Sequence, residues 1–444
     1  MHVSPPRFFT SKSKAFAVAA LWVASSNTVH AISFEQVDNN LLTSSQFIDC
    51  RDSNYFNGWS SAKDKQGGHL PGAKSFDSRW LTQLASDQAL EAKLKLLKLD
   101  KSVTTYLYGE EQATAALQSR LSSVGFQHVE VITGDINAYS GKRVSLANYD
   151  KLVPSWWVND LNQGKAVSHP PSANYKIVEV AWGMPKQYLM AHIPGAIYLD
   201  TNSLEEAPLW NVVSDKQLHN LLGELGIRSD TSVILYGRNN MAAARAANIM
   251  MYAGVRDVRL INGGWSAWQD YPSESMLNSP TAVTFDVTVP QRPELISSLT
   301  QAQAMLAQPD DASLVSIRTW DEYIGETSGY SYIEAKGRIT GSKWGRSGLG
   351  ANSLEAFRNL DHTMIDPAII EEYWRPWSID SKQDVAFYCG TGWRASEVFF
   401  YAHVMGWPSI SVFDGGWYEW SSNVERPTES GQPFLPSLMV SAGK

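Results

Sequence analysis

Residues 385–389 read VAFYC, and after a stretch with helical periodicity residues 410–417 read ISVFDGGW. The same order of motifs occurs earlier in the chain, where residues 233–237 read VILYG and residues 258–265 read VRLINGGW. The spacing from the tyrosine to the first glycine of the second motif is the same in both places. Repetition at a fixed spacing indicates copies of one structural unit.

A third and weaker copy lies upstream, at residues 105–109 (TYLYG) and 129–134 (VEVITG), where the second glycine and the tryptophan are missing. Each copy also has an earlier half. These halves are residues 47–51 (FIDCR) with 69–73 (HLPGA), residues 177–180 (IVEV) with 192–196 (HIPGA), and residues 314–318 (LVSIR) with 337–342 (GRITGS). Short β-branched runs that alternate with helical stretches predict parallel strands joined by crossover helices, an α/β fold.

Composition marks the boundaries between the copies. Residues 163–173 (QGKAVSHPPSA) and 272–292 are rich in Pro, Ser, Thr or Gly and lack helical periodicity, as linkers do. A chain of 444 residues with 43% hydrophobic content is also too long for a single core. We therefore predict domains at residues 32–164, 165–285 and 286–430, followed by a C-terminal tail at 431–444.

Residues 1–31 read as a secretory signal peptide. Three basic residues precede a short apolar stretch, residues 15–24 (AFAVAALWVA), and Val29 and Ala31 place small side chains at the cleavage positions. A membrane anchor is the alternative, but the apolar run is about half of the roughly 20 residues needed to span a bilayer. We expect cleavage after Ala31, a periplasmic location, and no membrane anchor once the signal is removed.

Net charge and cysteine content exclude several classes of partner and site. A formal net charge of -8 and a pI near 5.6 give no basic field for nucleic acid or anionic lipid. The two cysteines, Cys50 and Cys389, are too few for a disulfide framework; they could form one bridge, belong to a metal site, or be unrelated thiols. Because they fall in different copies of the repeat, we expect unrelated thiols. Without clustered Cys or His ligands, no metal site is expected.

The loop after the last copy's strand carries the candidate chemistry. Cys389 ends a strand and precedes a helix, so backbone N–H groups and the positive end of the helix dipole favour its thiolate. Gly390 and Gly392 allow the loop to curl around the sulfur, and Arg394 adds a permanent cation. The alternative is a buried core cysteine. The strand–loop–helix context favours a nucleophile.

The loop 389–394 (CGTGWR) resembles the active-site loop of the rhodanese family, residues 414–417 (DGGW) are similar to its C-terminal signature, and residues 192–196 (HIPGA) resemble its N-terminal signature. The likeness covers nearly the whole chain after residue 31. It implies three tandem rhodanese-like domains, each a parallel β-sheet flanked by helices, in a periplasmic three-domain sulfurtransferase. A small donor such as thiosulfate or mercaptopyruvate would pass its sulfur to Cys389. The resulting persulfide would serve a thiol or cyanide acceptor without any cofactor.

The resemblance also suggests roles for other residues. Arg394 would stabilise the anionic donor or the persulfide, and the loop backbone would come from Gly390, Thr391, Gly392 and Trp393. Trp393 would either shape the pocket mouth or anchor packing. Arg338 would bind a donor carboxylate or form a structural salt bridge. Arg318 is expected to tie its strand to a loop, and Asp414 to cap a turn.

The first two copies lack the thiol at the equivalent position. Gly109 and Gly237 stand there, so neither copy can form a persulfide. Of the two roles open to Cys50, core packing and redox partner, we expect core packing. We also expect the second domain to close one wall of the catalytic pocket. Two other readings remain: a persulfide carrier with a dedicated protein acceptor, and a Cys-x5-Arg phosphatase or arsenate reductase. The second is disfavoured because Cys389 and Arg394 are spaced as Cys-x4-Arg.

Overall fold

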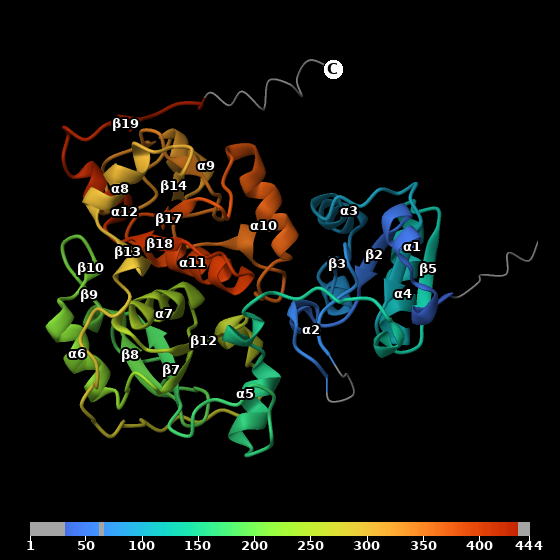
Figure 1. Ribbon diagram of the computed structural model, residues 1–444, viewed down its shortest axis with the longest axis horizontal. Coiled ribbons are helices and arrows are strands. Elements are labelled where there is room, and N and C mark those ends of the chain that lie inside the picture. The colour runs from blue at the N-terminus through green and yellow to red at the C-terminus, as the bar shows by residue number, and fades with distance from the viewer. Residues whose placement is uncertain (1–31, 62–65, 434–444) are drawn as a thin grey trace, which may run out of the picture.

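The computed structural model describes residues 32–61 and 66–433 (Figure 1). The predicted signal peptide and the end of the tail lie outside these residues. Within them, no helix is long and apolar enough to cross a lipid bilayer.

Three parallel sheets repeat along the described part of the chain, as the sequence predicts, and each has five strands there. The first has the order β1-β5-β4-β2-β3, with β1 (Ile32–Ser33), β2 (Gln46–Asp49), β3 (Lys74–Ser75), β4 (Thr105–Tyr108) and β5 (Val129–Thr133). The second has the order β6-β12-β11-β7-β8, with β6 (Leu152–Val153), β7 (Lys176–Ala181), β8 (Ile197–Asp200), β11 (Ser232–Tyr236) and β12 (Asp257–Ile261). The third has the order β13-β18-β17-β14-β16, with β13 (Ile296–Ser297), β14 (Ala312–Ser316), β16 (Lys343–Trp344), β17 (Asp384–Tyr388) and β18 (Ile410–Phe413).

Helices flank each sheet. They are α1 (Asn39–Ser44), α2 (Ser53–Asn57), α3 (Asp87–Leu96) and α4 (Glu111–Ser123) in the first domain; α5 (Ser155–Asn162), α6 (Asp215–Glu224) and α7 (Asn240–Ala253) in the second; and α8 (Leu299–Leu306), α9 (Trp320–Ile324), α10 (Pro367–Trp374), α11 (Trp393–Met405) and α12 (Gly416–Ser421) in the third. Two short antiparallel pairs complete the fold, β9 (Glu205–Glu206) with β10 (Asn211–Val212) and β15 (Arg338–Ile339) with β19 (Thr428–Glu429).

The second domain begins before the predicted boundary at residue 165. Leu152 and Val153 of β6 pair with Leu260 and Ile261 of β12, so β6 is an edge strand of the second sheet. The Pro- and Ser-rich stretch is a loop inside this domain, because the Ser172 backbone N–H donates to the Ser232 hydroxyl at 2.8 Å. A two-residue strand has no detectable periodicity, which is why composition placed the boundary too late.

The predicted boundary at residue 285/286 is too early. The backbone N–H groups of Gln291 and Arg292, beyond that boundary, still donate to the carbonyl of Tyr252 on the second domain. The third domain starts at β13. The beginning of the predicted tail is also anchored, because the Gly431 N–H donates to the Ile324 carbonyl at 2.7 Å.

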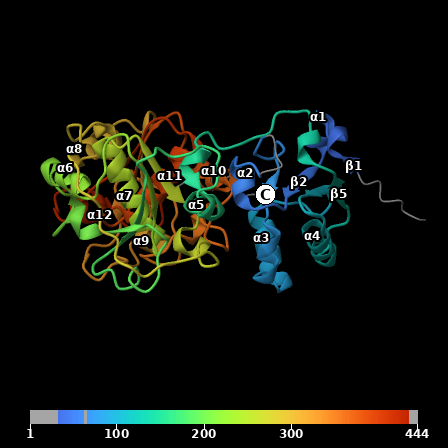
Figure 2. The same ribbon diagram turned by 90° about the horizontal axis from the view of Figure 1, so that it is seen from below.

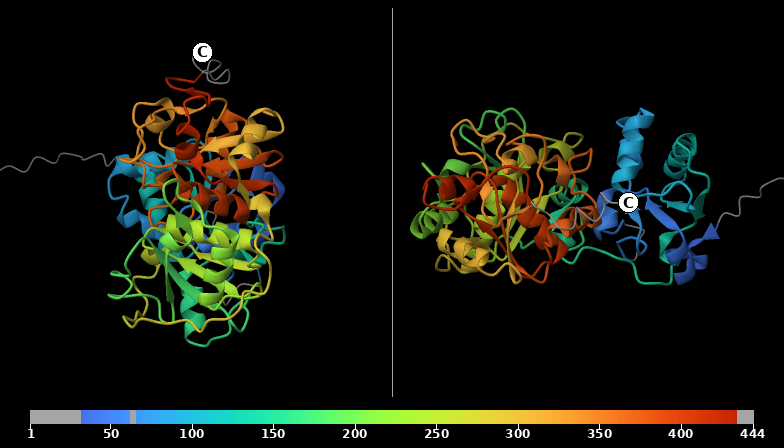
Figure 3. Two further views of the ribbon diagram at one scale, coloured as in Figure 1. Left: turned by 90° about the vertical axis from the view of Figure 1, so that its left-hand side faces the viewer. Right: turned by 90° about the horizontal axis from the view of Figure 1, so that it is seen from above.

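The second and third domains stack on one another through α7 and α11, and the first domain stands to one side (Figures 1, 2 and 3). The sequence predicts a core-facing side of α11, and its residues Ala395, Val398, Phe399 and Ala402 are buried. The opposite side is buried as well, since α7 covers it. The first domain contacts the third through Trp80, whose Nε1 donates to Asp361 at 2.9 Å. The stacking brings the second domain against the loop that follows β17.

Candidate active site

Cys389 lies at the carboxyl end of β17, and the loop that follows leads directly into α11. Its thiol is buried, and the backbone N–H of Gly392 donates to its Sγ at 3.2 Å. Gly392 is the N-cap of α11 and has a φ of 107°, a left-handed conformation that favours glycine. The backbone N–H of Trp417 donates to the Cys389 carbonyl at 2.8 Å and holds the loop from the other side. A backbone N–H and the start of a 13-residue helix thus converge on one sulfur.

The ring of Tyr330 covers the loop. A Cβ on Gly390 would stand 2.2 Å from Tyr330 Cε2, so only glycine permits this approach. The Tyr330 hydroxyl accepts a hydrogen bond from Arg394 Nη2 at 3.0 Å and donates one to the Ala351 carbonyl at 3.1 Å. Burial raises the pKa of Tyr330 although the charge of Arg394 opposes it. The hydroxyl therefore stays protonated beside the loop.

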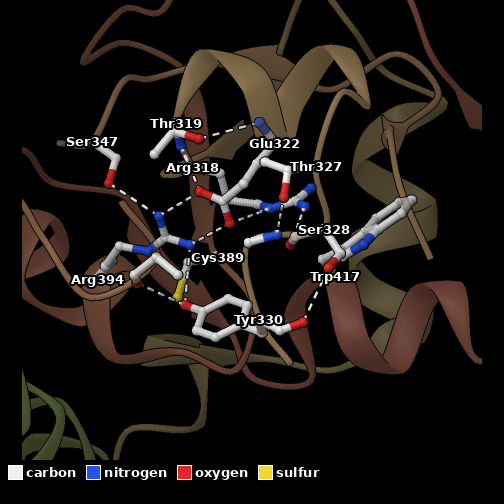
Figure 4. A network of polar contacts seen from close by, with 12 residues as sticks. Arg318, Thr319, Glu322, Thr327, Ser328, Tyr330, Ser347, Cys389, Arg394 and Trp417 are labelled. Carbon is white, nitrogen blue, oxygen red and sulfur yellow. Dashed lines mark hydrogen bonds and ion pairs between the residues drawn. The ribbon is translucent and has the colours of Figure 1, made fainter. Parts of the chain in front are cut away.

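Arg394 is held in a buried polar network (Figure 4). Its Nη1 and Nη2 each contact one carboxylate oxygen of Glu322 at 2.8 Å, and Nη1 also donates to the Ser347 hydroxyl at 3.2 Å. Glu322, on α9, also pairs with Arg318 at 3.4 Å. Burial alone would raise the pKa of Glu322, but the hydrogen bond and charge of Arg394, with the charge of Arg318, lower it to about 2. The cation predicted at position 394 is present, and protein groups occupy both of its outer nitrogens.

A cavity of about 710 Å³ lies over this loop, between the second and third domains. The third domain contributes Tyr330, Tyr332, Thr391, Trp393, Arg394 and Tyr418 to its lining. The second domain contributes Trp182, Glu205, Trp210 and Met241, among others. The second domain therefore forms one wall of the cavity beside the Cys389 loop, which is the arrangement expected of a catalytic pocket there.

Trp393 takes both of the roles considered for it. It lines the cavity, and its Nε1 donates to Glu205 Oε2 at 2.8 Å, which anchors the loop to the second domain. Glu205 Oε1 accepts from Arg245 Nε at 2.8 Å, and Arg245 Nη2 also contacts Asp414. The expectation that Asp414 caps a turn is wrong, because its carboxylate reaches across the domain interface.

Arg338 does not reach the cavity. Its Nη2 contacts Glu429 Oε2 at 2.9 Å, its Nη1 donates to the Gly431 carbonyl at 2.8 Å, and it lies over the ring of Tyr323. These partners come from β19 and its continuation, which return along β15. Of the two roles considered for Arg338, the structural salt bridge is the one present, and donor binding is not supported.

Two further expectations are confirmed. Arg318 ties its strand to a loop, since its Nη1 donates to the Gly337 carbonyl at 2.7 Å and its Nη2 to the Ser328 carbonyl at 3.3 Å. Cys50 and Cys389 are both free and buried. Burial, with the charge of Asp49, raises the pKa of Cys50, so the thiol form dominates there as expected of a packing residue.

Sequence reasoning missed four residues of this region: Glu205, Arg245, Glu322 and Tyr330. Only Glu322 carried a local signal, because Thr319 and Glu322 form a capping box at the start of α9. Tyr330 lies in an irregular loop, and Glu205 and Arg245 reach the site from the other domain. No pattern in the sequence around them indicates such contacts.

Comparison with known proteins agrees with this geometry. The family model of the rhodanese-like domain matches residues 33–142, 163–271 and 298–423. Thiosulfate sulfurtransferase YnjE of Escherichia coli is 45% identical over 389 residues, which are 87% of this chain and 89% of the relative. The sulfur carrier protein TtuD of Thermus thermophilus is 28% identical over 64% of this chain and 99% of its own.

Solved structures match over similar lengths. The crystal structure of YnjE has a TM-score of 0.86 and 43% identity, and the match covers 92% of this chain and 97% of that one. The wild-type structure of EanB has a TM-score of 0.84 and 35% identity, covering 92% and 99%. Other EanB structures contain hercynine, or ergothioneine with a cysteine persulfide. The tyrosine and threonine altered in those structures stand at the same sequence distances from the persulfide cysteine as Tyr330 and Thr391 stand from Cys389.

Proposed function

The chain belongs to the rhodanese family and is a sulfurtransferase, and from this premise we propose that Cys389 carries the transferred sulfur as a persulfide. The observation that carries the proposal is the position of its Sγ, which accepts the Gly392 N–H at the helix terminus beneath the interdomain cavity. Among the described residues, Cys50 is the other thiol, and it belongs to the first domain's core. The loop residues Thr391, Trp393 and Arg394, which follow Cys389, line the cavity, so Cys389 is the thiol that lies beside it.

The chemistry is a double displacement. The Cys389 thiolate attacks the outer sulfur of the donor, and a bond forms between that sulfur and Sγ. The donor's own bond to the sulfur breaks, and with thiosulfate the leaving group is sulfite, which takes the electron pair. An acceptor thiolate or cyanide then attacks the outer sulfur of the persulfide, and Cys389 leaves as a thiolate. The loop N–H and the dipole of α11 stabilise the sulfur anion in both steps.

We favour thiosulfate as the donor over mercaptopyruvate. YnjE is a thiosulfate sulfurtransferase and shares most of this chain's length. A mercaptopyruvate-like donor presents a carboxylate, and the arginine considered for it, Arg338, is engaged by Glu429 away from the cavity. Thiosulfate has no carboxylate, and its charge lies on the sulfonate oxygens and on the terminal sulfur that is transferred. Arg394 is the arginine that lines the cavity, with its outer nitrogens held by Glu322 and Ser347.

A small-molecule acceptor is a second candidate beside a thiol. The cavity walls are rich in aromatic rings, among them Trp182, Trp210 and Tyr332. Aromatic faces attract methylated ammonium groups, and the structurally similar EanB has been seen with hercynine in its structure. We therefore propose hercynine as one acceptor to be compared with cyanide, small thiols and protein thiols.

Mass spectrometry of the protein after incubation with thiosulfate tests the persulfide. We expect the peptide with Cys389 to gain about 32 Da, one sulfur, and the peptide with Cys50 to stay unchanged. Adding each acceptor in turn should restore the original mass, and repeated turnover with a small acceptor would argue against a dedicated carrier. Sulfur on Cys50, or hydrolysis of a phosphate ester at Cys389 instead, would contradict the assignment.

We also propose that the protein acts in the periplasm after removal of residues 1–31. The basic, apolar and small-residue segments at the start of the chain support this. N-terminal sequencing of the protein purified from a periplasmic extract should begin at residue 32. A full-length protein retained in the cytoplasm would contradict it.

A further inference from the structure

A charged side chain of the second domain reaches the catalytic loop of the third. Arg245, on α7, is wholly buried, and its Cζ lies 3.1 Å from the point where a Cβ on Gly392 would stand. Its Nη1 lies 3.2 Å from the same point. The guanidinium therefore packs directly on Gly392, the residue whose N–H donates to Cys389 Sγ.

Two acidic groups hold this guanidinium in place, one from each domain. Glu205 of the second domain accepts from Nε at 2.8 Å, and Asp414 of the third contacts Nη2. Glu205 also accepts from Trp393 Nε1, and Asp414 accepts the Val212 N–H at 3.0 Å. The network therefore contacts the loop at two adjacent residues, Gly392 and Trp393. A buried charge is tolerated only when it is paired in this way, so the geometry is strongly constrained.

The repeat contains a reciprocal pair at the equivalent place. Glu397 follows Cys389 at the same interval as Arg245 follows Gly237, and it is equally buried. Arg358 Nε donates to Glu397 Oε1 at 2.8 Å. Arg358 lines one small pocket with Asn239, the N-cap of α7, and Asn240, its first residue. One charged pair thus faces the catalytic loop, and its counterpart faces the loop without cysteine.

We propose that Arg245 is a positioning residue for sulfur transfer, supplied by a domain that has no thiol of its own. Fixed by Glu205 and Asp414, it sets Gly392 and Trp393 so that the Gly392 N–H points at the sulfur. This rests on the proposed function of Cys389. The third domain alone lacks this support, so the second domain contributes to sulfur transfer although it has no thiol.

The test compares the double variant Arg245→Met/Asp414→Asn with the matched control Arg358→Met/Glu397→Gln. The first removes both ion pairs of Arg245, with Glu205 and with Asp414, and the control removes the single pair of Arg358 with Glu397. The second substitution in each avoids leaving Asp414 or Glu397 as an unpaired buried charge, and Glu205 keeps Trp393 Nε1 as a donor. In single-turnover reactions with thiosulfate, we expect Arg245→Met/Asp414→Asn to slow persulfide formation about ten- to hundredfold at saturating donor. Its half-saturating donor concentration should change little. Arg245→Lys keeps the charge and should recover part of the rate.

A second readout does not need the donor. At a fixed pH, Cys389 alkylation by a small haloacetamide should be slower in Arg245→Met/Asp414→Asn than in the parent chain, because a misplaced N–H no longer stabilises the sulfur anion. Equal rates of persulfide formation and of alkylation in this variant and the parent would overturn the proposal, as would an equal loss in the control. If the parent chain forms no persulfide on Cys389, the proposed function fails, and the alkylation rates still decide the role of Arg245.

Discussion

Replacing Glu322 by glutamine tests the network that holds Arg394. The Glu322 carboxylate is fully buried between Arg394 and Arg318. Its pKa falls from 4.5 to about 2, because the two arginines outweigh the effect of burial. A fall of this size corresponds to about 3 kcal/mol of stability, and breaking a buried ion pair from one side costs about 3–5 kcal/mol. We expect Glu322→Gln to lower the free energy of unfolding of the third domain by about 3 kcal/mol at neutral pH.

The sign of the pH dependence follows from the direction of that shift. Because the folded state holds the Glu322 pKa below 4.5, the stabilisation is complete above that pH and is lost as the pH falls towards 2. The difference between Glu322→Gln and the parent chain should therefore be largest at pH 7 and smaller at about pH 3.

Hydrogen exchange into third-domain peptides, measured at increasing urea concentrations, gives the free energy of unfolding of this domain alone. Glu326→Gln is a matched control, because that side chain is exposed one turn further along the chain, and it should change the free energy by no more than about 0.5 kcal/mol. A loss below about 1 kcal/mol for Glu322→Gln, or the same loss at both pH values, would refute the reasoning.

Three further predictions concern the loop and its neighbours. Arg394→Lys keeps the charge but loses the paired contacts with Glu322, so steady-state assays should show a large loss of kcat/KM with a normal circular dichroism spectrum; unchanged kinetics would remove Arg394 from the site. Gly392→Ala places a Cβ at a φ of 107° and against Arg245, so it should slow persulfide formation. The control Gly134→Ala, at a φ of 92° with open space around it, should lower only the stability of the first domain, by about 1–2 kcal/mol. A chain lacking residues 32–147 keeps β6 and should retain appreciable sulfur transfer, while residues 293–444 alone should fold poorly because α11 loses its contact with α7; a third domain that matched the full chain in rate and thermal midpoint would contradict this.

The repeat and the strand–loop–helix placement of Cys389 could be predicted because their signals are local. The motif around Cys389 combines a strand, two glycines and a helix start within a few residues, and each repeat is one parallel sheet. Arg338 could not be assigned in the same way. Its partner Glu429 lies 91 positions later in the chain and is brought there only by the pairing of β15 with β19. A basic residue in a familiar motif indicates a charge, but the tertiary partner decides whether that charge is available to a substrate.

Tertiary packing also decides which groups of the second domain, which has no thiol, lie beside the Cys389 loop. α11 is buried on both sides, because the third sheet covers one side and α7 covers the other. Once α7 covers the start of this helix, the groups that adjoin the catalytic loop must come from the second domain, and Arg245 and Glu205 occupy that position. Gly237 rules out a persulfide at that position of the second domain, but the surface of α7 that faces Gly392 does not depend on the residue there. Sulfur transfer at Cys389 would therefore depend on α7 and Glu205 and not on the second domain's own loop.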